Sequence, residues 1–458
     1  MKLYNQKTKN SEECKFVDTK DIKIYTCGPT VYDYPHIGNW YTFIRYDVLV
    51  RTLRSTGSKV HWVMNITDVG HLVSDADSGE DKMEKGAKRE GKTAWDIAKF
   101  YSDYFLKGLE RLNFSEINDI PKATGYIVEQ IDLVKALEEK GFTYKISDGI
   151  YFDTSKFKTY ANFAQLDLSG LEEGARVAVN DEKRNPSDFA LWKFSPENEK
   201  RDMEWESPWG VGFPGWHLEC SAMIHAILGQ PIDIHAGGID HIPVHHTNEI
   251  AQSEAAYGIT LSNYWMHCNH IQVDGKKMSK SLGNFYTLED IESKGFSSII
   301  FKTLVLSGHY RSQSEFSFEN LEATRNRMQN WVDRLSAASQ TDTITDPLDI
   351  DTLKEQILNP LLNDLNTPLA LSIIDEQTSS IERESIKSYV ELINEILGID
   401  LAEYLENLSD EQFKLLNSRA EARENRDWSK SDAIRDELKE LGINVKDSES
   451  GQIWSRIV

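Results

Sequence analysis

The chain has 458 residues, of which 40% are hydrophobic and 27% charged, and its net charge is −23. It has no apolar run long enough to cross a membrane and no secretion signal at its start, so we expect a cytoplasmic protein of two or three domains. The acidic balance argues against a general nucleic-acid binder, and the four widely spaced cysteines do not resemble a disulfide framework.

Residues 22–39 carry the first functional pattern. Residues 22–26 are rich in β-branched and aromatic side chains, which predicts a buried strand, and an apolar-periodic run predicts a helix at about 39–56. The connecting loop contains His36 and Gly38. Backbone N–H groups at a helix start favour anions, and glycine lets a ligand approach the backbone. The loop is therefore a candidate phosphate site, although a histidine that only caps the helix gives the same pattern.

A second strand pattern follows at residues 57–68. Two strands with a helix between them form a β-α-β unit, so we predict a parallel sheet. Ligands bind such sheets beyond the carboxyl ends of the strands, which is where Cys27 and Thr67 lie.

The next part of the chain departs from this alternation. Residues 74–92 are polar and aperiodic, which predicts a surface loop. Helices are predicted from Thr93 onward and at about 124–140. A hairpin signal around Ser147-Asp148-Gly149 then indicates an insertion between two halves of the sheet. The insertion is short and simple.

The sheet is predicted to resume at residues 232–236, followed by Gly238 and Asp240. A strand that runs into glycine with an acid nearby suits ribose hydroxyls, and a simple turn is the alternative. A helix at 245–257 follows, with His245 and Glu249 on one face, as in a zinc ligand pair or a surface pair.

Residues 276–284 read K-K-M-S-K-S-L-G-N and follow a strand predicted at 264–270. The loop places Lys277 and Lys280 three residues apart, which suits a polyphosphate; a solvated basic turn is the alternative.

The character of the chain changes beyond about residue 316. Long amphipathic helices are predicted at about 317–338, 349–364, 367–379 and 383–397. Two shorter helices, 409–425 and 429–441, and a small hairpin complete the chain.

Taken together, H-I-G-N at 36–39 and K-M-S-K-S at 277–281 resemble the two signatures of class I aminoacyl-tRNA synthetases. The contexts C-G-P-T-V-Y-D at 27–33, P-G-W-H-L-E-C at 214–220 and H-H-T-N-E at 245–249 resemble the cysteinyl-tRNA synthetase family, essentially from end to end.

The resemblance implies an α/β fold: a Rossmann-type parallel-sheet catalytic domain with an insertion, an all-α bundle and a small C-terminal anticodon-binding domain. The implied boundaries are 1–120 and 216–272 for the two catalytic halves, 121–215 for the insertion, 273–315 for the K-M-S-K-S domain, 316–400 for the bundle and 401–458 for the anticodon-binding domain.

The resemblance also implies an activity. Such an enzyme activates L-cysteine with ATP and Mg²⁺ and transfers it to the terminal adenosine of tRNA(Cys), with one zinc ion per chain selecting the thiol. We expect a monomer with no membrane partner.

The family pattern assigns roles to named residues. It implies zinc ligands at Cys27, Cys220, His245 and Glu249. The cysteine-contacting positions are Gly28, Thr30, Thr67 and Trp216. ATP contacts fall to His36, Gly38, Asn39, Gly238, Asp240, Lys277 and Lys280, with His36 and the two lysines catalytic. The anticodon-binding positions are Arg423, Trp428, Asp432 and Asp447.

Two departures from the pattern bear on function. The first signature usually ends in histidine, where this chain has Asn39, and the position after it is usually small or basic, where this chain has Trp40. Two other functions stay open: a cysteine:aminosugar ligase with the same core, which lacks the tRNA-reading tail, and a non-catalytic tRNA-binding paralogue.

Overall fold

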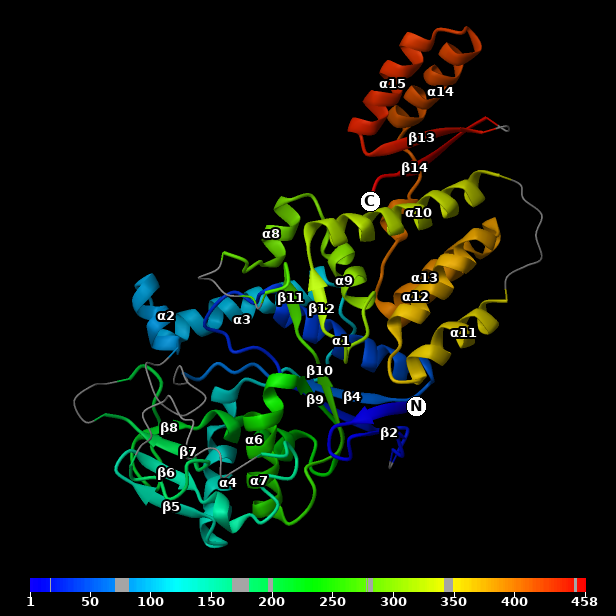
Figure 1. The fold of residues 1–458 in the computed structure, drawn as a ribbon. Helices are drawn as coiled ribbons and strands as arrows, with labels where there is room; N and C mark the ends of the chain where they lie inside the picture. The colour runs from blue at the N-terminus through cyan, green and yellow to red at the C-terminus, as the bar shows by residue number, and fades with distance from the viewer. Residues whose placement is uncertain are drawn as a thin grey trace. The chain divides into compact units, whose positions relative to one another are not determined.

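The computed structural model describes residues 1–16, 18–70, 82–166, 181–196, 201–276, 278, 283–341, 349–448 and 451–458. The chain divides into two compact units (Figure 1). Unit 1 comprises Met1–Glu110, Ser115–His270 and Tyr310–Gln313, and unit 2 comprises Arg111–Phe114, Ile271–His309 and Ser314–Val458.

A four-stranded parallel sheet forms the centre of unit 1. Its strands are β3 (Ile22–Thr26), β4 (Val60–Met64), β9 (Ile232–Gly238) and β10 (Ser262–Cys268), in the order β10-β9-β3-β4. The strands are apolar and almost wholly buried, as expected of a parallel sheet that helices cover on both faces. The predicted parallel sheet is confirmed, with β9 running two residues further than expected.

Unit 1 also contains six α-helices among the described residues. They are α1 (Ile37–Ser55), α2 (Lys82–Glu90), α3 (Ala94–Arg111), α4 (Ile127–Glu139), α6 (Trp216–Ile227) and α7 (Thr247–Tyr257), with a short antiparallel pair at the start, β1 (Lys2–Asn5) and β2 (Asn10–Glu13). The structure accounts for the bulky residue at position 40. Trp40 is fully buried and stacks on Phe105 of α3 at 5.4 Å, and a Cβ on Gly108 would lie 2.3 Å from its ring.

The insertion in unit 1 contains a four-stranded antiparallel sheet, β5-β6-β7-β8. Its strands are β5 (Thr143–Ile146), β6 (Gly149–Phe152), β7 (Phe189–Phe194) and β8 (Gly212–Pro214). The predicted hairpin is present, with Gly149 opening β6 instead of closing the turn. One face packs on α4 and α6 through a cluster that includes Phe152, Leu191 and Trp192.

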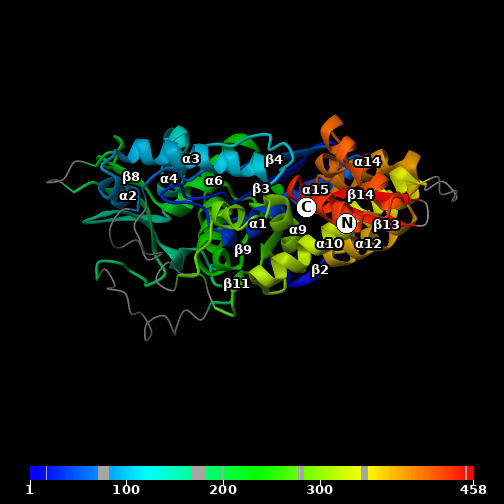
Figure 2. The same ribbon diagram turned by 90° about the horizontal axis from the view of Figure 1, so that it is seen from above.

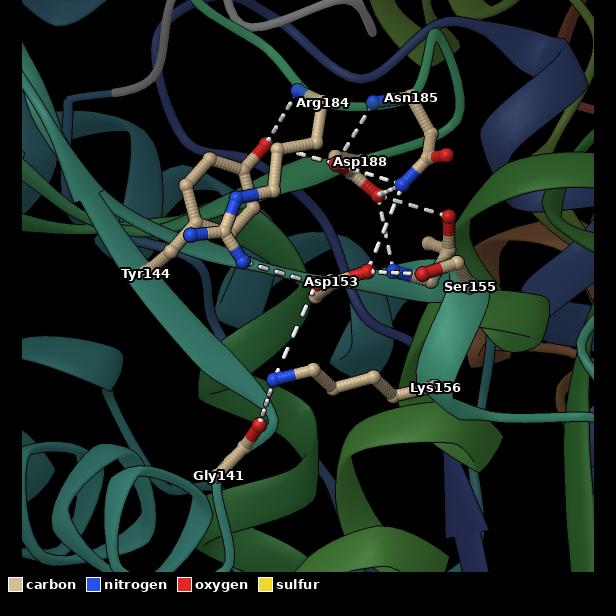
Figure 3. Close-up of polar contacts among 9 residues, drawn as sticks. Gly141, Tyr144, Asp153, Ser155, Lys156, Arg184, Asn185 and Asp188 are labelled. Carbon is tan, nitrogen blue, oxygen red and sulfur yellow. Dashed lines mark hydrogen bonds and ion pairs between the residues drawn. The ribbon is translucent and has the colours of Figure 1, made fainter.

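Two buried carboxylates fasten the segment before β7 to this sheet (Figure 3). Asp188 accepts hydrogen bonds from the backbone N–H and hydroxyl of Thr154 and from the hydroxyl of Tyr144. Asp153 pairs with Arg184 at 3.1 Å, and that guanidinium lies 4.3 Å from the centroid of the Tyr144 ring. Side chains from three separate stretches of chain therefore share one polar network.

This network predicts a stability effect. Asp188→Ala leaves the buried Thr154 and Tyr144 donors without their acceptor, which is expected to cost roughly 2–4 kcal/mol of unfolding free energy. Chemical denaturation of the variant measures the loss. Asp181→Ala, at an exposed position of the same segment, serves as the control and is expected to change stability by less than about 0.5 kcal/mol. Equal stability of the two variants would contradict the assigned role of Asp188.

Unit 2 is mainly helical. It begins with a parallel strand pair, β11 (Ile271–Val273) and β12 (Ser314–Phe316), and the helices α8 (Leu288–Ser293) and α9 (Ser298–Leu306). The bundle helices are α10 (Phe318–Gln340), α11 (Ile350–Leu362), α12 (Thr367–Gln377) and α13 (Ile386–Leu397). The tail consists of α14 (Asp410–Glu424), α15 (Trp428–Glu440) and the hairpin β13 (Ile443–Ser448) and β14 (Gly451–Arg456), with β14 beside α10 (Figure 1, Figure 2).

Among the described residues, no helix is both long and apolar enough to span a bilayer.

Candidate active site

The carboxyl edge of the parallel sheet collects the candidate residues of unit 1. Cys27 follows β3, and its N–H donates to Ala236 of β9 at 3.1 Å. Thr67 follows β4 and forms a bridge with Thr30. Because the strands run in parallel, their ends meet at one edge, where ligands bind in folds of this kind.

The loop after β3 ends at His36, which lies directly before the first turn of α1. His36 is the N-cap: its Nδ1 accepts from the N–H groups of Gly38 at 3.0 Å and Asn39 at 3.3 Å. In the neutral ring the proton then lies on Nε2, which is a donor. Asn39 completes a capping box, because its Oδ1 accepts from the His36 N–H at 3.0 Å. The amide at position 39 thus has a defined orientation, with Oδ1 as acceptor and Nδ2 as donor.

Four buried side chains gather beside this edge: Cys27, Cys220 of α6, His245 and Glu249 of α7. One ligand atom from each lies within 4.8 Å of the others, and Nε2 of His245 is 2.9 Å from Oε1 of Glu249. Two thiolates, one imidazole and one carboxylate are a donor set that Zn²⁺ accepts in tetrahedral sites. The residues present therefore fit a zinc ion.

The electrostatics of the cluster favour a bound cation. Burial alone raises the pKa of Glu249, but His235 and His245 outweigh it and hold that pKa well below its usual value. A hydrogen bond from Cys27, with a smaller contribution from His245, lowers the pKa of Cys220 to about 7, whereas burial raises that of Cys27. The Cys220 thiol therefore ionises more readily than the Cys27 thiol, and the Glu249 carboxylate is ionised.

A second layer of histidines orients these side chains. Nε2 of His235 on β9 lies 2.8 Å from Oε2 of Glu249, and Nδ1 of His217 lies 3.0 Å from Nδ1 of His245. Such outer contacts fix ring orientation at metal sites. Sequence analysis did not single out His217 or His235, although His217 lies inside the P-G-W-H-L-E-C motif.

Cys27 and Glu249 also belong to an overlapping donor group with His235 and His246, with Nε2 of His246 3.3 Å from the Cys27 sulfur. Because the two groups share two residues, they describe one site with alternative donors. The group with two thiolates is the better match for zinc.

The helix that carries His245 begins differently from the prediction. Residues Ile242–His246 form a π-helical turn, and regular α-helix starts at Thr247. Pro243 has no N–H to donate, and π turns of this kind occur frequently at functional sites. The i, i+4 contact between His245 and Glu249 is nevertheless made.

The predicted cysteine-contacting residues surround the cluster. Trp216 stacks on the His245 ring at 4.4 Å. The hydroxyl of Thr67 donates to Glu219 at 3.0 Å. Gly28 approaches β4 so closely that a Cβ would lie 1.7 Å from the Asn65 carbonyl oxygen, so only glycine fits there.

The structure describes some of the predicted ATP-binding residues. Gly238 closes β9 in unit 1, where a Cβ would lie 2.3 Å from the Asp240 carboxylate, and Asp240 is exposed. Lys277 and Lys280 lie outside the described residues. Of their loop, the structure describes Met278 and the turn at Gly283.

The predicted anticodon-binding residues all lie in the tail of unit 2. Asp447 of β13 pairs with Arg423 of α14 at 3.0 Å. Trp428 opens α15 and is 56% exposed, with the Arg423 guanidinium 5.5 Å from its ring centroid. Asp432 pairs separately with Arg435 at 3.2 Å.

Comparison with known proteins agrees with this geometry. The family model for the class I (C) tRNA synthetase catalytic domain matches residues 13–326, and that for the cysteinyl-tRNA ligase anticodon binding domain matches residues 405–454. The chain is 42% identical to the cysteine–tRNA ligase of Treponema denticola and 41% identical to that of Finegoldia magna, each over 100% of both chains.

Solved structures agree in fold. Methionyl-tRNA synthetase of Mycobacterium tuberculosis superposes with a TM-score of 0.60 at 15% identity, covering 83% of this chain and 92% of that chain. With family models matched in both the catalytic part and the tail, and full-length relatives at this identity, the chain belongs to the cysteinyl-tRNA ligase family of class I aminoacyl-tRNA synthetases.

Proposed function

We propose that this protein is a cysteine–tRNA ligase. In the first step a carboxylate oxygen of L-cysteine attacks the α-phosphate of ATP, which forms cysteinyl-adenylate and releases pyrophosphate. In the second step a ribose hydroxyl of the terminal adenosine of tRNA(Cys) attacks the activated carbonyl, and AMP leaves. Neither step needs a covalent bond to the enzyme, so catalysis consists of positioning and charge stabilisation.

The observation that carries the proposal is the buried group of Cys27, Cys220, His245 and Glu249 in a chain of this family. A zinc ion held there would supply a direct bond to the substrate thiol, which serine cannot match. An apolar pocket separates near-isosteres by only about 1–3 kcal/mol, so such a bond also accounts for an insertion without an editing domain. Trp216, stacked on His245, would close the pocket around the side chain.

His36, Lys277 and Lys280 would bind the phosphates. Because Nδ1 of His36 accepts from the helix N-terminus, the proton of the neutral ring lies on Nε2, and this N–H would donate to a phosphate oxygen. Gly38 and Asn39 lie at the same helix start, and Gly238 and Asp240 would bind the adenosine. Mg²⁺ would enter with ATP as part of the substrate.

The alternatives receive less support. A cysteine:aminosugar ligase would not need the tail that matches the anticodon binding domain. The hypothesis of a non-catalytic paralogue was based on Asn39. This support is weakened because Asn39 completes the capping box and so has a hydrogen-bonding role at the helix start. The monomeric state and the cytoplasmic location stay predictions.

Cysteine-dependent ATP–pyrophosphate exchange, run beside serine with zinc quantified in the same sample, tests the proposal. We expect exchange with cysteine only and about one zinc per chain. A folded, zinc-loaded protein without exchange would overturn the catalytic assignment.

Lys280 supplies a separate prediction. Lys280→Ala removes a positive charge that would stabilise the departing pyrophosphate, so the rate of exchange at saturating cysteine should fall by about 10²–10³. The KM for cysteine should change little. Lys276→Ala, four residues earlier and exposed, is the matched control. Unchanged exchange in Lys280→Ala would remove Lys280 from the mechanism.

A further inference from the structure

A buried arginine lies beneath the predicted anticodon-binding surface of unit 2. Arg419 of α14 is 1% exposed, and its guanidinium donates to both oxygens of Asp447, at 3.0 and 3.2 Å. The same guanidinium donates to Oε1 of Gln452 on β14 at 2.8 Å. Gln452 in turn donates to the Leu416 carbonyl. The β13–β14 hairpin is therefore joined to α14 by polar side-chain contacts in addition to apolar packing.

Burying an arginine at position 419 has a cost in folding free energy. The core of the tail is small, consisting of Leu416, Ile434, Leu438, Ile443 and Val445. Burying a charge costs free energy even when it is paired, and a well-packed apolar side chain often stabilises a fold as well or better. A planar bidentate donor, however, fixes the carboxylate it binds in one orientation, which an apolar residue cannot do.

The fixed carboxylate orients a second arginine. Arg423 lies one helical turn after Arg419 and forms an ion pair with Oδ2 of Asp447 at 3.0 Å. Arg419 thereby occupies two of the roughly four lone-pair sites of this carboxylate, and the Arg423 cation lies against one of the same oxygens. The hydrogen bond from Arg419, helped by Arg423, also lowers the pKa of Asp447. Both oxygens of Asp447 are therefore already engaged by arginines, and Arg423 is the more exposed of the two partners.

Arg423 is presented next to an exposed aromatic ring. Its guanidinium lies 5.5 Å from the centroid of Trp428, a ring that is 56% exposed. An aromatic face that stacks on a base, beside an arginine that donates to the base edge, is a common arrangement for binding unpaired RNA bases.

We propose that Arg419 is a positioning residue for anticodon recognition, acting through Asp447 to hold Arg423 beside Trp428 as a preformed site for one unpaired base. The inference rests on the proposed function. It reassigns Asp447 from reading a base to orienting the arginine that does so. The Asp432–Arg435 pair differs, since both side chains are about half exposed or more and a single 3.2 Å contact joins them.

The test uses the full-length protein and tRNA(Cys) transcripts with the native anticodon or with one anticodon base replaced. Arg419→Met and Asp447→Asn are each combined with Arg423→Ala in double-mutant cycles. Arg426→Met, an exposed arginine at the end of the same helix, is the control. Thermal unfolding verifies that the tail is folded, and tRNA-independent ATP–pyrophosphate exchange reports on adenylate formation, which needs no contact with the anticodon.

Each single variant is expected to reduce kcat/KM for the native tRNA about 10-fold or more, mainly through KM, and to reduce discrimination against the replaced base. Adding Arg423→Ala should reduce neither quantity further, because all three residues act through one contact. Additive effects, or charging within about two-fold of wild type in folded Arg419→Met and Asp447→Asn, would overturn the inference. Wild-type protein without exchange would instead overturn the proposed function.

Discussion

The Cys220→Ser variant is expected to lose its zinc and, with it, about a thousand-fold of its cysteine-dependent exchange, a change of several kcal/mol in transition-state stabilisation. Serine has nearly the shape of cysteine, but its hydroxyl does not ionise at neutral pH and is a poor zinc ligand. In this protein Cys27 and His245 lower the pKa of Cys220 to about 7, so its thiol gives up a proton to a metal more readily than an ordinary cysteine does. Metal analysis and exchange on the same preparation measure both effects.

The matched control is Cys268→Ser. Cys268 is fully buried at the end of β10, a strand of the same sheet, and it does not belong to the cluster. Its variant should keep about one zinc per chain and most of the activity. Retention of zinc and of exchange in Cys220→Ser would show that the four-residue group is not the metal site.

His36→Asn is expected to reduce the rate of exchange by about 10²–10³ while the KM for cysteine changes little. Asparagine is among the best N-cap residues, so α1 should still begin at the same place. What the variant lacks is the distal N–H of the ring, the group proposed to bind a phosphate oxygen. The substitution thus separates the two interpretations that the sequence left open for this histidine.

Two further variants complete the His36 experiment. His61→Asn changes a histidine on β4 that pairs with Asp119 away from the α1 cap, and it should leave exchange near the wild-type rate. His36→Ala removes both the cap and the donor, so it should add a loss of stability of about 1 kcal/mol. If His36→Asn exchanges at the wild-type rate, His36 is only a cap.

Many elements of the fold were predictable from local patterns. Strand 22–26 and the paired tail helices follow directly from periodicity and capping residues, and their ends in the structure lie within three residues of the predicted ones. The surface loop predicted at residues 74–92 was wrong for Lys82–Glu90, which form the helix α2, and residues 74–81 lie outside the described residues. The π turn at Ile242–His246 was not predicted, because it depends on a proline and on the packing around it and not on apolar spacing.

Contacts between distant segments were beyond sequence reasoning. In the sequence, Asp153 and Asp188 resemble ordinary acidic loop residues. Their hydrogen-bond donors come from other segments, which only the folded sheet brings close to them. Arg419 has the pattern of a solvated helix residue, yet it is buried because the β13–β14 hairpin folds over it. The family motifs indicated which side chains would gather around Glu249, but no spacing rule indicates that His235 holds its second oxygen.

The order of strands in the central sheet constrains how the protein is made. Thr26 of β3 pairs with Ala236 of β9, about 210 residues later in the chain. At typical synthesis rates of about 5–20 residues per second, β9 is synthesised roughly 10–40 s after β3, so one edge of β3 stays unpaired for that time. During that time an apolar strand edge is open to other chains, which is where aggregation begins. Cys27 emerges just as early, while its proposed partners on α6 and α7 do not yet exist. Loading of the proposed zinc site would therefore be a late event that follows completion of the sheet. Slow or stalled translation of the insertion should increase the demand for chaperones.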